Sequence, residues 1–138
     1  LTPSDYSIDT VSDALLALPE LADGIVYQNN SDRLLDSDYQ EYYFGNGELL
    51  GEDSEYVYIV SPTTSVCEAG VFKVTDEEQK TALINAFEKR RENLIQTHTN
   101  YSPEDLAVSE GLITGSFDDV VYFVAAPDNT PIEQAIKG

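Results

Sequence analysis

The chain contains one cysteine and one histidine, Cys67 and His98, and a Cys–His pair can form a catalytic nucleophile. Such a pair requires a thiolate in an electropositive pocket and a histidine within hydrogen-bond reach. Cys67 is followed directly by Glu68, whose charge is expected to raise the pKa of the thiol, and His98 falls at the end of a predicted helix. A histidine there commonly contacts the last carbonyl groups of the helix. We therefore interpret both residues as structural, and we predict no catalytic residue.

Carboxylates are abundant, with 26 Asp and Glu residues, so metal binding has to be considered. Zinc sites need several Cys or His ligands, and one of each is too few. Calcium is bound through oxygen atoms alone. The segment from Asp36 to Asp38 begins like a calcium loop but departs from that pattern at Gln40 and Glu41. No cofactor is predicted, and a calcium-stabilised surface scaffold stays open as an alternative.

A pair of carboxylates is also the machinery of most glycoside hydrolases. In so acidic a chain, almost any fold places two acids at a suitable separation, so the sequence holds no specific signature of such a pair. A cell-wall hydrolase is the second alternative. It predicts a deep acidic cleft that contains a carboxyl group of raised pKa.

Aromatic side chains gather with acids and amides just before the first glycine-rich turn. Tyrosine rings stack on sugars or peptides while neighbouring polar groups orient the ligand. The candidate ligand surface consists of Tyr39, Tyr42, Tyr43 and Asn46. The competing interpretation, which we favour, is that these tyrosines form the buried side of a short helix.

Five of the seven basic residues fall between Lys73 and Arg91. In the segment 88–92 they are flanked by glutamates, and Glu88 and Arg91 are spaced to pair on a helix. We expect this segment to be a solvated helix face whose charges are neutralised locally.

The net charge of −19 narrows the choice of partners. A field of that sign repels nucleic-acid phosphates and anionic lipid headgroups. We therefore predict no nucleic-acid partner and no direct electrostatic docking to a membrane. The length of 138 residues and the hydrophobic content of 41% suit one domain, residues 1–138.

Two predicted β-hairpins account for most of the apolar segments. The first joins strands at 55–60 and 69–74, and the second joins 112–117 to 120–126 through Asp118 and Asp119. A long helix from a capping box at Thr75 to about Thr97 separates them. Both faces of the strand at 55–60 are apolar, which predicts a sheet covered on both sides.

Shorter helices complete the predicted fold, at 8–18, 37–44, 102–110 and 130–137. Capping boxes are predicted to begin those at Thr10 and Thr130. The predicted class is α+β, with a four-stranded, mainly antiparallel sheet in the order α-α-β-β-α-β-β-α and a short helix before the second hairpin. Residues 1–53 form an N-terminal helical and acidic loop portion.

From about residue 54 to 138 the chain resembles the bacterial domain of unknown function 4358 family. The segments that carry the resemblance are the strand 68–74 running into Asp76, the long helix with Ala86 and Lys89-Arg90, the connector 101–104, the strand 121–125 and the helix 132–136. Members of that family resemble lipoproteins of Gram-positive, largely gut-dwelling bacteria. The resemblance implies export and a lipid anchor upstream of this chain, and it transfers no site residue.

Export also agrees with the composition, which is rich in Tyr, Ser, Thr, Asp and Asn and poor in Lys. The chain begins at Leu1 and contains no methionine, so we expect it to be a fragment from which a leader was removed. Together these features predict a non-catalytic, extracytoplasmic lipoprotein domain. We expect it to lie at the cell surface and to bind a peptide, a glycan or an envelope protein.

Overall fold

The computed structural model describes residues 1–63 and 65–138. Its helices are α1 (Ile8–Leu16), α2 (Ser37–Phe44), α3 (Glu77–His98), α4 (Pro103–Glu110) and α5 (Thr130–Lys137). Its strands are β1 (Ile25–Gln28), β2 (Tyr56–Val60), β3 (Glu68–Lys73), β4 (Ile113–Phe117) and β5 (Val120–Ala125). The predicted α+β class is confirmed. None of the described helices is long and apolar enough to cross a membrane.

Within the described residues the sheet has five strands in the order β1-β2-β3-β5-β4, and every neighbouring pair is antiparallel. The prediction of four strands was therefore wrong by one. The additional strand, β1, lies in the portion predicted to contain helices and loops. It has only four residues and pairs with the outer edge of β2, so its conformation depends on a partner that is distant in sequence.

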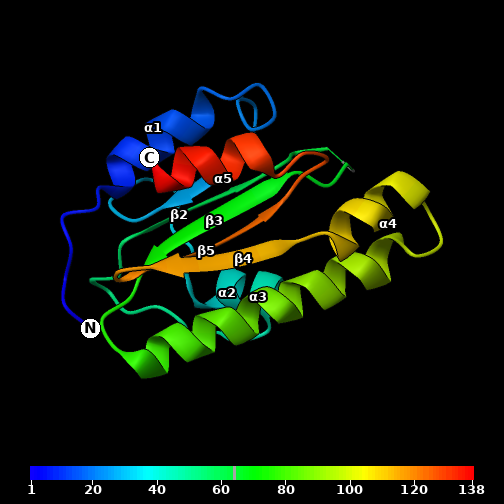
Figure 1. Ribbon diagram of the computed structural model, residues 1–138. Coiled ribbons are helices and arrows are strands. Elements are labelled where there is room, and N and C mark those ends of the chain that lie inside the picture. Colours follow the sequence, from blue (N-terminus) through cyan, green and yellow to red (C-terminus); the bar gives the residue numbers. More distant parts are fainter. Residues whose placement is uncertain (64) are drawn as a thin grey trace.

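The sheet is covered on both faces, as predicted (Figure 1). Helices α1 and α5 lie on one face, and α2 and α3 lie on the other, with α4 folded back beside the C-terminal end of α3. Strand β5 is buried throughout, and its side chains alternate between the two layers. Val120, Tyr122 and Val124 pack under α1 and α5, whereas Val121 and Phe123 pack toward α3.

The layer beneath α2 and α3 is strongly aromatic. Phe87 of α3 lies 4.9 Å from Phe123 and 5.6 Å from Phe72, measured between ring centroids. Gly70 of β3 lies under these rings, and a Cβ there would come within 2.6 Å of Phe123. A glycine is thus required where the rings cross the strand.

The helices begin close to the predicted positions, but the residues that cap α1, α3 and α5 differ from those predicted. The side chain of Ser7, rather than that of Thr10, caps α1 by accepting from the Thr10 amide at 3.1 Å. Asp76, one residue after Thr75, caps α3 through the Gln79 amide at 2.8 Å. The capping box predicted at Thr130 is wrong, since Asn129 precedes α5 without a capping hydrogen bond.

Hydrogen bonds join the N-terminal segment to the sheet, at the end where the β4–β5 turn lies. The Lys73 ammonium donates to the carbonyl oxygens of Ser4 and Tyr6 at 2.9 and 3.1 Å. Ser4 donates to the carboxylate of Asp119 through its amide and its hydroxyl. Burial raises the pKa of Asp119, but these hydrogen bonds and the charge of Lys73 outweigh it, so the pKa lies below its usual value.

Candidate ligand-binding groove

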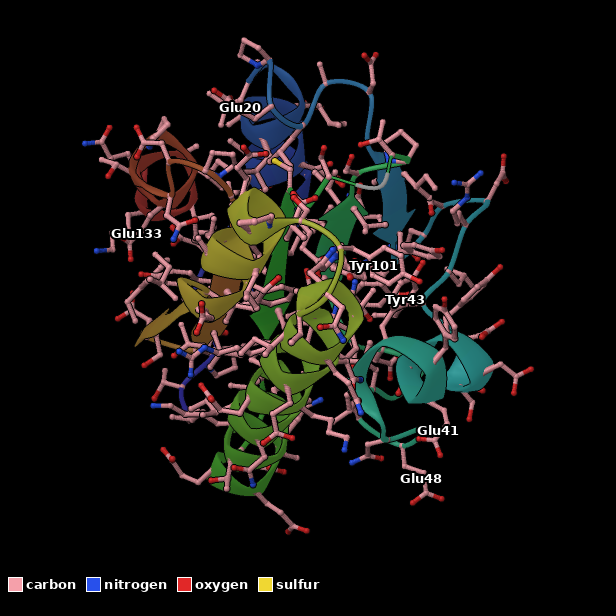
Figure 2. The ribbon with its side chains drawn as sticks, turned by 90° about the vertical axis from the view of Figure 1, so that its right-hand side faces the viewer. Glu20, Glu41, Tyr43, Glu48, Tyr101 and Glu133 are labelled. Atoms are coloured by element: carbon pink, nitrogen blue, oxygen red, sulfur yellow. The ribbon has the colours of Figure 1, made fainter. Side chains whose placement is uncertain are left out.

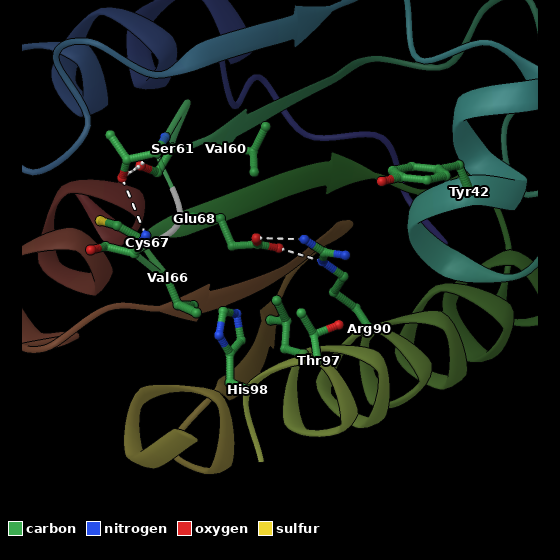
Figure 3. Close-up of a pocket in the computed structure, with 12 residues that line it drawn as sticks. Tyr42, Val60, Ser61, Val66, Cys67, Glu68, Arg90, Thr97 and His98 are labelled. Carbon is green, nitrogen blue, oxygen red and sulfur yellow. Dashed lines mark hydrogen bonds and ion pairs between the residues drawn. The ribbon is translucent and has the colours of Figure 1, made fainter. Parts of the chain in front are cut away.

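A groove of about 310 Å³ opens between the β2–β3 connection and the C-terminal half of α3, with Tyr42 of α2 at one side (Figure 3). Three of the residues considered for chemistry, Tyr42, Cys67 and His98, line this groove. Its described lining consists of Tyr42, Val60, Ser61, Thr63, Ser65, Val66, Cys67, Glu68, Arg90, Leu94, Thr97 and His98.

The floor of the groove is an ion pair between β3 and α3. Arg90 donates from Nε and Nη2 to the two carboxylate oxygens of Glu68, at 2.7 and 2.8 Å. The side chain of Glu68 is 2% exposed and that of Arg90 is 13% exposed. Tyr58 of β2 donates a further hydrogen bond to Glu68 Oε1 at 2.8 Å. Both carboxylate oxygens therefore accept hydrogen bonds from protein donors, three in all.

The guanidinium of Arg90 also lies against the ring of Tyr43. Its carbon lies 5.2 Å from the centre of the Tyr43 ring, and the Tyr43 hydroxyl is 2.9 Å from that of Tyr27. Burial alone would lower the pKa of Arg90, but its hydrogen bonds with Glu68 raise it above the usual value. Burial raises the pKa of Tyr58, and the neighbouring Glu68 adds to that effect. Arg90 is thus a fixed cation and Tyr58 stays neutral.

This pair corrects the prediction for the basic segment of α3. Arg91 does lie on the exposed side, where it pairs with Glu88 at 3.7 Å as expected. Arg90, one residue earlier, turns inward to Glu68 instead of joining a solvated face. Successive residues on a helix lie about 100° apart, so two adjacent arginines can have opposite environments.

Hydroxyl groups line the wall formed by the β2–β3 connection. The Ser61 and Thr63 hydroxyls are 2.9 Å apart, and the Ser61 hydroxyl also accepts from the Thr63 amide at 3.2 Å. The amide of Val66 donates to Asp105 of α4 at 3.1 Å, which fastens the connection to that helix. The described part of this wall therefore presents the hydroxyls of Ser61 and Thr63, and Val66 connects it to α4.

Cys67 and His98 line the same groove from different elements (Figure 3). Burial, followed by the charges of Glu20 and Glu68, raises the pKa of the Cys67 thiol to about 11. That thiol donates to the carbonyl of Glu20 at 3.3 Å. His98 is the last residue of α3, and its carbonyl accepts from the Tyr101 amide at 3.2 Å. Cys67 therefore remains a thiol at neutral pH, and a thiolate nucleophile has no support here.

The four residues of the predicted ligand surface lie in different places. Tyr42 reaches the groove, with 73% of its surface exposed, and Tyr43 lies behind it against Arg90. Tyr39 is 43% exposed and packs on Tyr27, with ring centroids 5.0 Å apart. Asn46 lies in the turn after α2, where its side chain accepts from the Glu48 amide at 2.9 Å. Only Tyr42 and Tyr43 are thus associated with the groove.

The interpretation that the tyrosines form the buried side of α2 is wrong for Tyr39 and Tyr42, which are exposed, whereas Tyr43 is partly buried against the core. The buried residues of that helix are Gln40 and Phe44. The Gln40 side chain donates to the Leu35 carbonyl and accepts from the amides of Leu49 and Leu50, at 2.9 to 3.1 Å. These bonds organise the segments around α2 and leave Tyr42 directed outward.

The view onto this end of the molecule places the exposed acids around the periphery (Figure 2). Tyr43 and Tyr101 lie toward its middle, while Glu41 and Glu48 lie beside α2 and Glu20 lies near α1. Among residues 1–63 and 65–138, no three His, Cys, Asp or Glu side chains gather closely enough to hold a metal ion. The calcium alternative therefore rests on the overall charge alone.

Comparison with known protein families matches residues 52–126 to the family described as Domain of unknown function (DUF4358). The chain belongs to the DUF4358 family. Searches of the curated proteins and of the solved structures found no match. The DUF4358 match spans β2 to β5 and includes Glu68 and Arg90, whereas Tyr42 lies before it.

The Glu68–Arg90 pair was not predicted from the sequence, although a signal for it exists. Side chains alternate along a strand, so Glu68 shares a strand face with Gly70 and Phe72, which points toward the core. A charged residue on such a face requires a partner of opposite charge. In the DUF4358 portion of the chain, most of the basic residues that could pair with Glu68 lie in α3.

Proposed function

We propose that this DUF4358 chain is a non-catalytic, extracytoplasmic lipoprotein domain that binds a peptide or a glycan of the cell envelope in the groove beside Tyr42. The observation that carries the proposal is the exposed ring of Tyr42 next to a groove with an ionic floor and a hydroxyl-lined wall. An envelope protein would dock through an extended segment that enters the same groove.

The ring of Tyr42 is positioned by its contact with Tyr43, which leaves it suited to stack on a ligand. It packs edge-on against Tyr43, with centroids 4.9 Å apart and planes at 80°. Tyr43 in turn lies against Arg90 and Tyr58. An aromatic ring held in this way loses little conformational entropy when a ligand stacks on it.

The polar groups of the groove suit a ligand with many hydroxyl or amide groups. Ser61, Thr63 and Thr97 contribute hydroxyls, and His98 contributes an imidazole. Small-molecule sites commonly combine aromatic contacts with a few polar groups that fix the orientation of the ligand. This combination supports recognition of sugar rings or peptide bonds.

The same geometry favours binding over hydrolysis. Glu68 is the one carboxylate among the described lining residues, and both of its oxygens accept hydrogen bonds from Arg90. A glycoside hydrolase needs two carboxyl groups that flank the scissile bond. The groove supplies one carboxylate, and that one is committed to a structural pair.

The test is a titration followed by two-dimensional NMR, with peptidoglycan digests separated into glycan and peptide fractions as probes. We expect one fraction to shift the signals of Tyr42, Thr63 and His98 without being cleaved. Tyr42→Ala should weaken binding about tenfold, because a stacked ring contributes on the order of 1 kcal/mol beyond its buried area. Tyr42→Phe should retain most of the affinity, because it keeps the ring.

Leu34→Ala is the matched control, since Leu34 is a large, exposed apolar side chain outside the groove lining. Equal binding by Tyr42→Ala and the parent chain would contradict the proposed site, and cleavage of either fraction would contradict a non-catalytic role. The proposed anchor is tested separately in the native bacterium. There the protein should partition with membranes, incorporate a labelled fatty acid and be digested by protease added to intact cells.

A further inference from the structure

The outer edge of β4 is an open sheet edge in the described part of the chain. Strand β4 pairs with β5 on one side, and no other described strand adjoins it (Figure 1). A sheet edge exposes unpaired amide and carbonyl groups that can pair with another extended chain.

The β4–β5 turn determines which groups face outward. Phe117 and Val120 flank a two-residue turn, Asp118 and Asp119, in which Asp118 has a φ of 50°. In a hairpin of this length the residues flanking the turn form a hydrogen-bonded pair, and such pairs alternate with non-bonded ones along the ladder. The amide and carbonyl groups of Thr114 and Ser116 therefore point away from β5.

Nothing in the described structure occupies these groups. Thr114 and Ser116 are exposed, and within residues 1–63 and 65–138 no loop or side chain is hydrogen-bonded to their backbone. The opposite edge of the sheet differs, because the amide of Gln28 in β1 is already bonded to the carbonyl of Arg33 at 3.0 Å. The β4 edge thus leaves the outward groups of both Thr114 and Ser116 open, whereas the β1 edge is already bonded at Gln28.

The sequence of β4 also lacks the usual protection of an edge strand. Natural edges commonly carry a charge, a proline or a bulge that prevents pairing with other chains. Residues 113–117 read Ile-Thr-Gly-Ser-Phe, with neither charge nor proline, and they pair with β5 in continuous register. No charged side chain within β4 would therefore repel a strand that pairs with this edge.

The charges at the two ends of β4 define the partner. Glu110 is exposed just before the strand and Asp118 is exposed just after it, in a molecule of net charge −19. An antiparallel pairing of two copies through β4 would bring Glu110 of one copy toward Asp118 of the other, and like charges repel. An extended segment with Lys or Arg near both of its ends would instead be attracted.

We propose that the β4 edge binds an extended, basic segment of a partner protein as an additional strand of the sheet. Main-chain hydrogen bonds to Thr114 and Ser116 provide the docking, and the acids at the strand ends select basic flanking residues. This surface is separate from the groove beside Tyr42, so the two proposals are tested independently.

The probe is a pool of seven-residue peptides with lysine at both ends and varied β-branched and aromatic residues between them. We expect the pool to slow hydrogen exchange at the Thr114 and Ser116 amides by about tenfold or more, because each amide gains a hydrogen bond. A matched pool with glutamate at both ends should give little protection at low salt. Absence of protection by the lysine pool would overturn the proposal.

Ser116→Pro removes one outward amide without removing a bond to β5, and edge strands tolerate proline at such a position. It should abolish the protection of Thr114, whereas Ser116→Thr, which keeps the amide, should not. Undiminished binding to Ser116→Pro would contradict the assigned edge. If Ser116→Pro does not fold, the proposal is tested by whether the lysine peptides slow hydrogen exchange at the Thr114 amide of the parent chain. Protection that depends on protein concentration without peptide would mean that a second copy covers the edge, which also overturns the proposal.

Discussion

The buried pair between Glu68 and Arg90 is the residue-level feature on which both the groove and the packing around it depend. A charge removed from water is costly, and it is tolerated here because Glu68 receives three hydrogen bonds, two from Arg90 and one from Tyr58. The pair also links β3 to α3, and among the described residues no other side-chain hydrogen bond or ion pair joins these two elements. Its contribution is best measured by removing one partner at a time.

We predict that Arg90→Met lowers the free energy of unfolding by about 3 kcal/mol or more, because it leaves the Glu68 carboxylate buried and unpaired. Arg91→Met is a matched control on the adjacent residue of α3. Arg91 is more exposed and donates mainly to the carbonyl of Glu110, so its loss should cost about 1 kcal/mol or less. Urea unfolding at neutral pH measures both.

The double variant Glu68→Gln with Arg90→Met separates a lost ion pair from lost packing. Glutamine carries no charge and can still accept from Tyr58, so the double variant should be more stable than Arg90→Met alone. A double variant no more stable than the single one would mean that the methylene stem of Arg90, and not its charge, supports the structure.

At the residue scale, the sequence predicted features that depend on close neighbours. Glu68 was expected to raise the pKa of Cys67, and it contributes to the rise after burial and Glu20. The pairing of Glu68 with Arg90 was not predicted, because it joins residues 22 positions apart whose meeting depends on how α3 is rotated against the sheet. The outward direction of Tyr42 was likewise not predicted, because it depends on the burial of Gln40, which bonds to Leu35, Leu49 and Leu50.

The elements were predictable wherever a pattern extends over several residues. Both hairpins, the long helix and the turn at Asp118 and Asp119 were predicted because they combine alternating or helical apolar spacing with turn or capping residues. Strand β1 was not, because four residues carry too little pattern and the strand is stabilised by β2. Sequence therefore predicts elements that are locally favourable better than elements that depend on tertiary pairing.

The crossing of β3 beneath aromatic rings gives a prediction at this scale. Gly70→Ala should lower the free energy of unfolding by about 1–3 kcal/mol, because the new Cβ would lie 2.6 Å from Phe123 and 2.8 Å from Phe72. Gly51→Ala is the control, since apart from its two chain neighbours no residue has an atom within 4 Å of the added Cβ. Thermal and urea unfolding should show a large effect for the first and a small one for the second; similar effects would contradict close packing at Gly70.

For the molecule as a whole, the net charge of −19 influences stability more diffusely than any single pair. Like charges repel more strongly in the folded chain than in the expanded one, and dissolved salt screens this repulsion. The acids are spread over the surface, and in the described residues they do not gather into a cluster that could hold a metal ion. Any stabilisation by cations should therefore be general.

We predict that the thermal midpoint of the chelator-treated protein rises by a few degrees with added salt, since a small domain gains several degrees per kcal/mol. Calcium and magnesium chloride should act equally, and sodium chloride of matched ionic strength should reproduce most of the effect, because all three screen the same repulsion. A midpoint that rises several degrees further with calcium than with magnesium would contradict this, because an ion that binds the native state specifically stabilises it by linkage. The acidic segments around α2 would then be the first place to locate a calcium site, and the scaffold alternative would replace simple screening as the explanation for so acidic a chain.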